Sequence, residues 1–532
     1  MAVREFNTAG PSVAGKHYCL DPLQRIELPE LLSLIQAERY FVLHAPRQTG
    51  KTTCLISLMK YLNAQGHYRA VYANIESAQT ARNNVADGLR AVCSSVAASI
   101  KMHLGDKISA DAWLGIFNDQ GHNSALIELL RHWTQADPSR PTVLFLDEID
   151  ALVGDTLVSV LRQLRSGYND RPDNFPTSVI LCGVRDVRDY RIHTGGGEII
   201  TGGSAFNIKA ESIRIGNFTQ TDIANLYAQH TADTGQQFEG EIFDKVWDDT
   251  AGQPWLVNAL AREACFKLPE GKDRNRPIDL EIYLQAREQL IQSRATHLDQ
   301  LTDKLKENRV HRVIASMLAG EGNDNIPTDD MQYVQDMGLI TLDQQVRISN
   351  AIYREVIPRE LTWTRQLTIA HNTSWYVMPD KRLDIPKLLL AFQQFFRENA
   401  DAWIERFQYK EAGPQLLLQA FLQRVINGGG RLTREYGLGM LRMDLYLEWP
   451  LDDVLAFRGP LQRVVFELKI LRNSMKTTLA DGLAQTSRYA SICGADEAHL
   501  LVFDRSTKKP WSKKIWRKKE VVDGKAVLVW GM

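Results

Sequence analysis

The chain has 532 residues, too many for a single hydrophobic core, so we expect about three or four domains. Its formal net charge of -1 excludes a general attraction to nucleic acid, and any such binding must come from local basic patches. The six cysteines form no C-x-x-C pair, which argues against a disulfide frame or zinc site and is typical of reduced thiols in a cytoplasmic protein. The sequence shows no signal-peptide pattern and no apolar run long enough to cross a membrane. We therefore expect a cytoplasmic protein with no membrane partner.

Apolar strands alternate with helical stretches in the first part of the chain. Residues 39–44 form an apolar run that leads into a loop, and the spacing of apolar residues over 52–64 predicts a helix after that loop. Further apolar runs predict strands at 68–76, 141–150 and 178–186. Strands rich in Val, Ile and Leu between helices are typical of a parallel sheet covered on both faces. We therefore predict an α/β domain at residues 1–216.

The loop after the first strand, APRQTGKT at 45–52, fits the phosphate-binding pattern G-x-x-x-x-G-K-[ST], with alanine in place of the first glycine. In such a loop, backbone N–H groups surround the β-phosphate, and the N-terminus of the next helix adds its dipole. Gly50 lets the backbone approach the phosphates, Lys51 neutralises them, and the Thr52 hydroxyl binds Mg²⁺. The nucleotide-binding residues predicted in this loop are Ala45, Gln48, Thr49, Gly50, Lys51, Thr52 and Thr53.

An apolar strand that ends in two acids, VLFLDEID, follows later in the same domain. In this position Asp147 would hold Mg²⁺, directly or through water, and Glu148 would polarise the attacking water. A buried strand with two acids at its solvent end is the alternative interpretation. The occurrence of both elements in this order favours an ATP site.

Polar residues near other strand and helix ends are further candidates for the nucleotide site. Arg185 follows the next strand, where it could sense the γ-phosphate. Pro254 follows a Gly252–Gln253 break that either places a helix end against the adenine or only begins a helix. Four more arginines could act on a neighbouring subunit or be ordinary surface residues: Arg162, Arg165, Arg171 and Arg188.

These stretches, together with VYANIE, FPTSVILCGVRDVRDYR and TAGQPWLVNALA, resemble the AAA-like ATPases of bacteria, relatives of the archaeal-type and STAND ATPases. The resemblance covers roughly residues 15–365. It implies a five-stranded core in the strand order of the additional-strand-catalytic-Glu ATPases, and ATP hydrolysis that drives or gates a conformational change. Members often form homo-oligomers, and this chain is a candidate for one. The chain becomes helical from about residue 217, and the lid that the resemblance implies falls at 217–300. The order of two helices and a hairpin predicts a winged helix at 301–370, whose acidic second helix argues against reading DNA.

The last part of the chain, residues 385–532, predicts an α+β domain with two acids and a lysine on adjacent strands. Asp444 lies in LRMDLYLEW, while Glu467 and Lys469 lie two apart in VVFELKI and so point to one face of a strand. Two carboxylates can bind Mg²⁺ or Mn²⁺, which clamps a phosphodiester and activates water. A lysine beside them orients that water or stabilises charge in the transition state. The pattern alone is weak, because solvated strand faces often carry such residues.

The order of the surrounding elements strengthens this interpretation. A long helix and a Gly-rich turn precede the Asp strand, and a helix with Gln485 and Tyr489 on one face follows the Glu-x-Lys strand. This order resembles the PD-(D/E)XK nuclease fold over about residues 385–532, although Met443 stands in place of the proline. The resemblance implies a catalytic core, a supporting glutamine and a helix glutamate, which here are Asp444, Glu467 and Lys469, then Gln485, then Glu411.

A basic run at 505–519 contains Trp511 and Trp516 and no acid. It suits contact with phosphates and bases, or a solvated helix face whose tryptophans cover the sheet. We favour packing for the tryptophans and DNA contact for part of the charge. The whole sequence thus predicts an ATP-controlled, metal-dependent DNA nuclease, an architecture that suggests defence against phage or mobile elements. The main alternative is a regulatory STAND-like NTPase switch whose nuclease-like domain is a binding or assembly module, and a third possibility is an ATPase that remodels a protein partner without nucleic acid.

Overall fold

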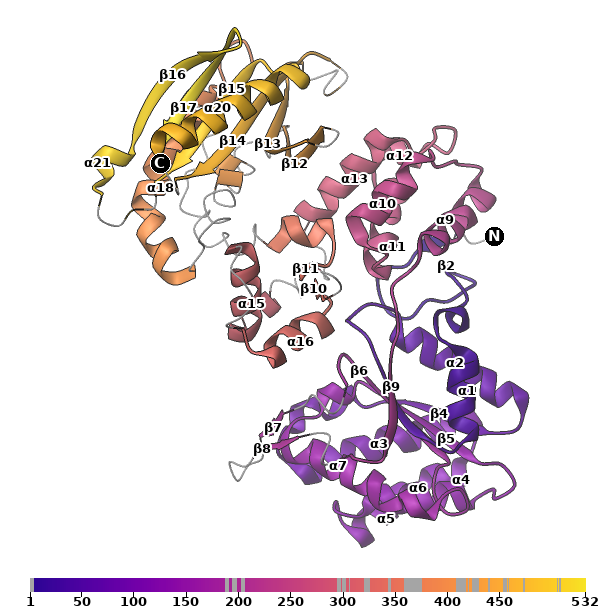
Figure 1. Cartoon of the computed structure of the whole chain (residues 1–532). Coiled ribbons are helices and arrows are strands. Elements are labelled where there is room, and N and C mark those ends of the chain that lie inside the picture. Colours follow the sequence, from indigo (N-terminus) through magenta and orange to yellow (C-terminus); the bar gives the residue numbers. More distant parts are fainter. Residues whose placement is uncertain are drawn as a thin grey trace. The chain divides into compact units, whose positions relative to one another are not determined.

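The structure is a computed structural model, and its contacts divide the chain into two compact units (Figure 1). The first unit consists of residues 1–301 and 327–354, and the second of residues 302–326 and 355–532. The residues that the structure describes are 4–186, 191–193, 199–201, 206–293, 298, 303–305, 307–319, 326–342, 346–357, 376–407, 418–419, 421–422, 430–438, 441–452, 457, 459–471, 474–504, 506 and 509–532.

A parallel sheet of five strands forms the centre of the first unit. Its strands, in spatial order, are β4 (Arg69–Asn74), β5 (Thr142–Asp147), β6 (Ser178–Gly183), β3 (Tyr40–His44) and β9 (Lys209–Arg214). β6 therefore stands between the strand that enters the predicted phosphate-binding loop and the strand that ends in Asp147. Since the strands are parallel, all their carboxyl ends meet at one edge, which is where ligands bind in such sheets.

Helices cover both faces of this sheet, as the continuous apolar strands predicted. One core packs the sheet against α1 (Leu28–Gln36) and α2 (Lys51–Gln65). The other packs it against α3 (Val85–Leu104), α6 (Ala125–Gln135) and α7 (Gly154–Ser166). Shorter elements of this part are η1 (Pro22–Arg25), η2 (Glu76–Ala81), α4 (Lys107–Asp111), α5 (Trp113–Gln120), η3 (Ile149–Ala151), η4 (Gly167–Asp170), β7 (Arg191–His193) and β8 (Ile199–Thr201). The first unit thus has the predicted α/β architecture, a parallel sheet covered by helices on both faces.

A helical region follows β9. Its elements are α9 (Gln220–Thr234), α10 (Glu241–Thr250), α11 (Pro254–Arg262), the π-helical turn η6 (Glu263–Lys267), α12 (Pro269–Lys272) and α13 (Leu280–Gln292). A capping box between Thr219 and Asp222 fixes the start of α9. The N-terminal strands β1 (Glu5–Phe6) and β2 (His17–Tyr18) pair in parallel. Phe6 and Tyr18 are buried against the rings of Tyr227 and His230 in α9, which ties the N-terminal segment to this helical region.

Two helices and a hairpin occur in the order expected for a winged helix. They are α15 (Asn308–Ala319), α16 (Thr328–Asp336), β10 (Ile340–Thr341) and β11 (Arg347–Ile348). α15 groups with the second unit, whereas α16 and the hairpin group with the first. Gly338, after α16, packs against Pro46, where an added Cβ would lie 2.8 Å from the proline Cγ.

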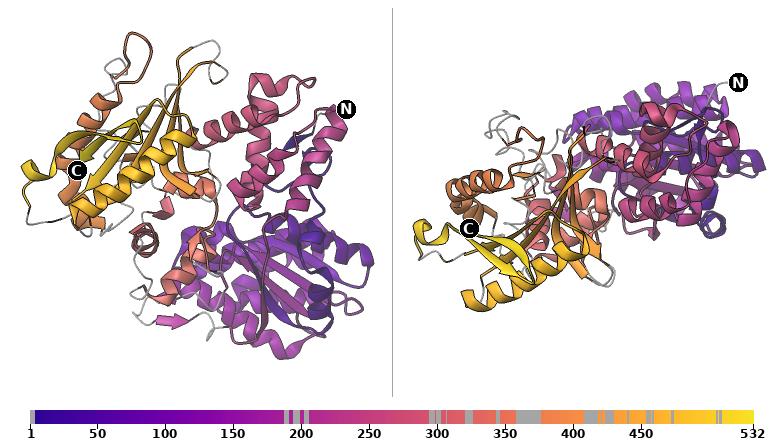
Figure 2. Two further views of the ribbon diagram at one scale, coloured as in Figure 1. Left: turned by 45° about the horizontal axis from the view of Figure 1, so that its top comes forward. Right: turned by 90° about the horizontal axis from the view of Figure 1, so that it is seen from above.

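A mixed sheet of six strands forms the second unit. Its strands, in spatial order, are β12 (Arg431–Leu438), β13 (Leu441–Pro450), β14 (Leu461–Ile470), β15 (Glu497–Phe503), β17 (Lys525–Gly531) and β16 (Trp516–Val522). The pairs β14–β15 and β15–β17 are parallel, and the other pairs are antiparallel. The helices are α18 (Ile385–Phe407), α20 (Met475–Ile492) and α21 (Trp511–Lys514). α18 and α20 lie on opposite faces of the sheet (Figure 2).

The basic run differs from the helix face that we considered for it. Among the described residues of this run only Trp511–Lys514 is helical, and Trp516–Val522 form strand β16. No helix within the described ranges combines the length and apolarity needed to cross a bilayer.

Candidate functional site

The predicted phosphate-binding loop lies between β3 and α2 and has the backbone of an anion cradle. Gly50 has φ 91° and Gln48 has φ 58°, so both adopt the left-handed conformation that tight loops require. Lys51 begins α2, and its Nζ donates hydrogen bonds to the carbonyls of Ala45 (3.0 Å) and Pro46 (3.1 Å). Thr49 is buried, and its hydroxyl donates to Pro46 O at 2.8 Å. The loop therefore holds a cation at the N-terminus of a helix, where an anion binds most favourably.

Asp147, at the end of β5, is fully buried and accepts three hydrogen bonds. The Thr52 hydroxyl donates to its Oδ2 at 2.7 Å, the Tyr72 hydroxyl donates to the same oxygen at 2.9 Å, and the N–H of Glu148 donates to Oδ1 at 3.0 Å. Hydroxyl and carboxylate oxygens held this close fit a shared Mg²⁺, which prefers hard oxygen ligands. The contact of Tyr72 with Asp147 was not predicted from the sequence, because a tyrosine in an apolar strand is not a pattern that indicates nucleotide binding.

Glu148 follows Asp147 in a left-handed conformation, with φ 63°. Such a conformation is strained for a residue with a side chain and is concentrated at functional sites. The side chain lines the cavity described below. Burial, helped by the charges of Asp150 and Asp147, raises the pKa of this carboxyl to about 7, and Lys51 opposes the shift. A carboxyl with a pKa near neutrality is suited to accept a proton from water.

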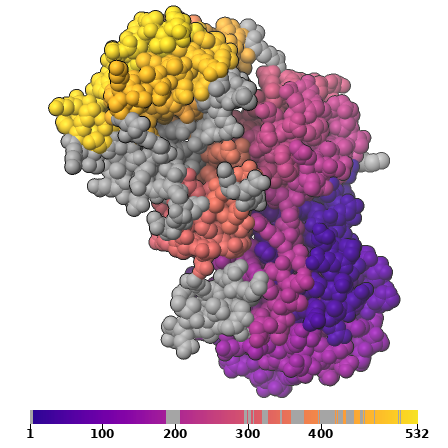
Figure 3. Space-filling model, viewed as in Figure 1, coloured from indigo at the N-terminus to yellow at the C-terminus, as the bar shows by residue number. Residues whose placement is uncertain are grey.

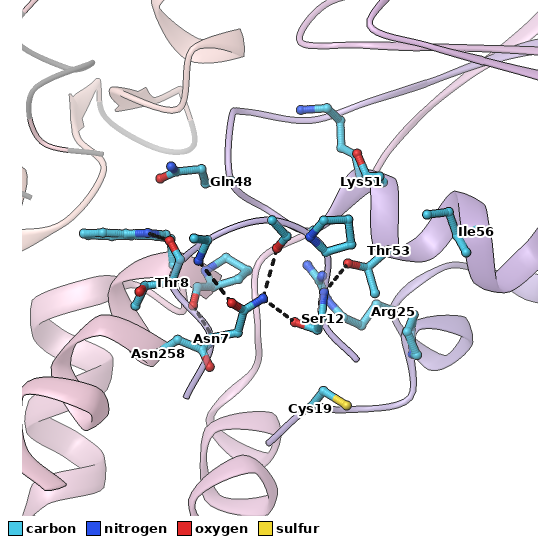
Figure 4. A pocket seen from close by; sticks show the side chains of 18 of the residues that line it. Asn7, Thr8, Ser12, Cys19, Arg25, Gln48, Lys51, Thr53, Ile56 and Asn258 are labelled. Atoms are coloured by element: carbon cyan, nitrogen blue, oxygen red, sulfur yellow. Dashed lines mark hydrogen bonds between the residues drawn. The ribbon is translucent and has the colours of Figure 1, made fainter. Parts of the chain in front are cut away.

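A cavity of about 580 Å³ opens beside the loop (Figure 4). Its size is typical of small-molecule sites. The cavity is lined by the predicted catalytic residue Glu148 and by six predicted nucleotide-binding residues: Gln48, Gly50, Lys51, Thr52, Thr53 and Pro254. Three other predicted residues do not line the cavity but form hydrogen bonds within the loop or to its lining residues. Ala45 O accepts from Lys51, Asp147 accepts from Thr52, and Thr49 donates to Pro46 O.

The N-terminal segment 7–12 forms another wall of the cavity, which the sequence analysis missed. The N–H of Ser12 donates to the Thr53 hydroxyl at 3.2 Å, and the indole N–H of Trp255 donates to Thr8 O at 2.9 Å (Figure 4). The segment therefore connects the loop helix α2 with α11 of the helical region. α11 begins at Pro254 with Gln253 as its cap, so this break both starts a helix and borders the cavity.

Arg25 holds the phosphate-binding loop from the side. Its guanidinium donates to Thr49 O at 2.7 Å and to Gly216 O at 2.8 Å, and it lies 4.8 Å from the ring centre of Phe218. A Cβ on Gly50 would lie 2.7 Å from its Nη1, and the φ of 91° at Gly50 also favours glycine. Burial lowers the pKa of Arg25 below its usual value. Arg25 thus links the loop to the chain between β9 and α9.

Arg185 and the described arginines that were considered for a neighbouring subunit do not line the cavity. Arg185 is buried, donates to Asp336 of α16 at 3.2 Å and lies over the ring of Tyr333, and it is not part of the cavity wall. Arg171 lies over the rings of Tyr168 and Tyr40. Arg162 and Arg165 are exposed on α7, and Arg188 lies outside the described residues.

The second candidate site lies where β13 and β14 pair. Leu445 pairs with Phe466, so Asp444 and Glu467 are neighbours across the two strands. Asp444 Oδ2 accepts the N–H of Leu468 at 2.8 Å, and Lys469 Nζ donates to Glu467 Oε1 at 2.8 Å. The strand register therefore brings the three predicted catalytic side chains together.

The protein surroundings of Glu467 leave one of its two carboxylate oxygens without a hydrogen bond. It is only 3% exposed, and its Oε2 is buried and accepts no hydrogen bond from any described group. Burial, and then the charge of Asp444, raises its pKa to about 7 against the opposing effect of Lys469. An unsatisfied carboxylate oxygen beside a second carboxylate is the kind of site that a divalent cation completes. Within the described residues no group of three or more His, Cys, Asp or Glu side chains surrounds a common point.

Helix α20 approaches this site closely. A Cβ on Gly482 would lie 2.8 Å from Leu500 Cδ1 and 3.3 Å from Lys469 Cγ, so glycine lets the helix settle on the strands. Tyr489 is buried on the same helix, whereas Gln485 is exposed. Glu411 lies outside the described residues.

The sheet order, the phosphate-binding loop and the Asp147 strand define the class of the first unit as a P-loop NTPase. Residues 30–358 match the family described as AAA-like domain, and the chain belongs to that family. The match ends before the second sheet begins. None of the curated proteins matches the chain.

Several solved structures are similar to the chain. A Walker-type ATPase of Pyrococcus abyssi has 13% identity, with 66% of this chain and 99% of that one covered and a TM-score of 0.46. Cdc6p of Pyrobaculum aerophilum has 16% identity, 67% and 97% coverage and a TM-score of 0.36. The RuvB Holliday junction branch migration motor of Thermotoga maritima has 13% identity, 66% and 95% coverage and a TM-score of 0.33.

Proposed function

We propose that the chain binds and hydrolyses ATP with Mg²⁺, and that its nucleotide state controls a metal-dependent phosphodiesterase site, a DNA nuclease, in the second unit. The observation that carries the nuclease part is the unsatisfied Oε2 of Glu467, buried beside Asp444 and Lys469. A buried carboxylate oxygen without a partner is costly, and a bound cation would satisfy it. The proposed role in defence against phage or mobile elements rests only on the combination of an ATPase domain and a nuclease-like domain in one chain.

At the first site, Lys51 and the loop N–H groups hold the phosphates of ATP, and Thr52 with Asp147 would hold Mg²⁺. Bound Mg²⁺ supplies charge neutralisation at the phosphates. Glu148 takes a proton from the water that attacks the γ-phosphorus, and the bond to the leaving ADP oxygen breaks. Residues 7–12 line the cavity beside these groups.

At the second site, Asp444 and Glu467 would hold Mg²⁺ or Mn²⁺, and a bound ion supplies Lewis acidity toward the scissile phosphate. Lys469 stabilises the negative charge that develops on that phosphate. Water attacks the phosphorus in line with the leaving sugar oxygen, whose bond to phosphorus breaks. Gln485 and Glu411 remain candidates for supporting roles.

Plasmid cleavage by the purified full chain tests this proposal. We expect cleavage with Mg²⁺ or Mn²⁺, none with EDTA, and a loss of at least about a hundredfold in both Asp444→Ala and Lys469→Ala. Lys476→Ala removes an exposed lysine from α20 and should cleave as the wild type does. Failure to cleave under every nucleotide condition, or cleavage that survives both site variants, would overturn the nuclease assignment and favour a binding or assembly module.

A further inference from the structure

The cavity beside the phosphate-binding loop is lined by the N-terminal part of the chain and by the helical region α9–α13, which adjoin at the molecular surface (Figure 3, indigo and magenta to pink). Its cationic lining residues are Arg25, Arg47 and Lys51. Arg25 and Lys51 both donate hydrogen bonds to backbone carbonyls. Arg47 is exposed and forms no hydrogen bond, ion pair or ring contact with any described residue. Among the described residues of this wall, it is therefore the cation whose N–H donors remain available to a ligand.

The backbone places Arg47 next to the ammonium group that is expected to bind the phosphates. In a loop of this kind the lysine reaches the β- and γ-phosphates, and here Lys51 Nζ lies 3.1 Å from Pro46 O. The peptide nitrogen of Arg47 is bonded to the carbonyl carbon of Pro46, so Arg47 begins beside this ammonium. Glu148, the proposed base, lines the same cavity. Arg47 thus extends from the part of the loop where phosphates are expected, in a cavity that also contains the proposed base.

The arginine that its sequence position suggested as a γ-phosphate sensor is engaged elsewhere. Arg185 donates to Asp336 at 3.2 Å, lies over the ring of Tyr333 and does not line the cavity. The side chains of Arg185 and Asp336 are 11% and 3% exposed, so separating them would deprive a buried carboxylate of its cation at a high cost. Arg47 requires no such rearrangement, because it is already exposed at the cavity wall.

We propose that Arg47 is a catalytic residue that contacts the γ-phosphate of the ATP bound in its own loop. This inference rests on the proposed ATP hydrolysis. As water attacks the γ-phosphorus, a proton of the water passes to Glu148, and the bond between that phosphorus and the leaving ADP oxygen breaks. Arg47 stays protonated and donates N–H groups to the γ-phosphoryl oxygens, over which negative charge is spread in the transition state. The loop itself thus supplies an arginine in cis.

Two other roles are open to an exposed arginine of a loop, and they differ from the proposed one in what they predict. An arginine that remains in solvent changes neither nucleotide affinity nor turnover. An arginine that reaches the nucleotide of another copy of the chain allows two inactive variants to restore activity when they are mixed. An arginine that acts in cis allows no such restoration.

The test compares the wild-type full chain with Arg47→Ala, Arg47→Lys and the control Arg39→Ala, which removes an exposed arginine outside the cavity wall. Isothermal titration calorimetry with Mg²⁺ measures the binding of ADP and of a non-hydrolysable ATP analogue with a β–γ imido bridge. Phosphate release measures kcat, and ADP with aluminium fluoride reports the binding of a transition-state analogue. Arg47→Ala and Glu148→Gln chains are also assayed as a mixture.

We expect Arg47→Ala to bind ADP as the wild type does, because ADP lacks the γ-phosphate. It should bind the ATP analogue roughly tenfold more weakly, lose at least about a hundredfold in kcat and fail to retain ADP with aluminium fluoride. Arg47→Lys should be intermediate, because lysine keeps the charge but lacks the planar set of donors. Arg39→Ala should match the wild type in every measurement.

Unchanged turnover in Arg47→Ala, equal losses for ADP and the ATP analogue, or activity restored by mixing with Glu148→Gln would overturn the inference. Equal losses would mean that the substitution disturbs the loop and not a contact with the γ-phosphate. A wild type that binds no nucleotide would refute the proposed function itself. The two failures are distinguishable, because nucleotide binding and hydrolysis by the wild type are measured in the same series.

Discussion

The pH dependence of ATP hydrolysis tests the role proposed for Glu148. Burial, with Asp150 and Asp147 nearby, raises the pKa of its carboxyl to about 7. A general base acts only when it is deprotonated, so activity should be lost as pH falls through this value. The ratio kcat/KM reports ionisation of the free protein. A group is roughly one tenth deprotonated one pH unit below its pKa and roughly nine tenths deprotonated one unit above it, so kcat/KM should rise roughly tenfold across this interval.

The assay is steady-state phosphate release with saturating Mg²⁺ over a pH series. Glu148→Gln should retain ATP binding and lose hydrolysis by about 10²- to 10⁴-fold, since only the water-activating group is removed. ATP binding to Glu148→Gln over the same series reports ionisation of ATP itself and serves as the control. A flat wild-type profile, or a variant with unchanged turnover, would show that another group is the base.

Three further substitutions test the two sites. Lys51→Ala should abolish ATP binding in an equilibrium titration, because it removes the cation at the phosphates; binding within twofold of wild type would contradict this. Arg25→Met removes both hydrogen bonds that hold the loop, so ATP affinity should fall at least tenfold, about 1.4 kcal/mol, and retained affinity would show that the loop needs no such support. Gly482→Ala overpacks the contact with Leu500 at a cost of about 1–3 kcal/mol, partly offset by about 1 kcal/mol of helix propensity. It should slow cleavage more than Ala484→Gly, a control on the exposed face of α20, and equal effects on cleavage would refute a role in placing Lys469.

Local sequence patterns were sufficient to predict the strands and the helix that surround the phosphate-binding loop in the first unit. The apolar run before the loop, the spacing after it and the strand ending in Asp147 all occur near the predicted bounds, as β3, α2 and β5. Each of these signals lies within a few consecutive residues. The alternation of Glu467 and Lys469 likewise predicted a shared face, because a strand has a period of two.

Contacts set by tertiary packing could not be predicted in the same way. Residues 7–12 reach the cavity because Phe6 and Tyr18 are buried against α9, far along the chain. Arg185 pairs with Asp336, a partner that no local pattern identifies. The strand β16 lacks an alternating pattern because it is an edge with charge on both faces, which explains why a helix face was an alternative for it.

Cleavage of DNA with and without ATP, compared between wild type and Lys51→Ala, tests nucleotide control most directly. The proposal predicts that ATP changes the metal-dependent cleavage rate of the wild type at least tenfold. It predicts that Lys51→Ala cleaves at one rate, whether ATP is present or absent. A wild type that ignores ATP, or a Lys51→Ala variant that still responds to it, would contradict the coupling of the two sites.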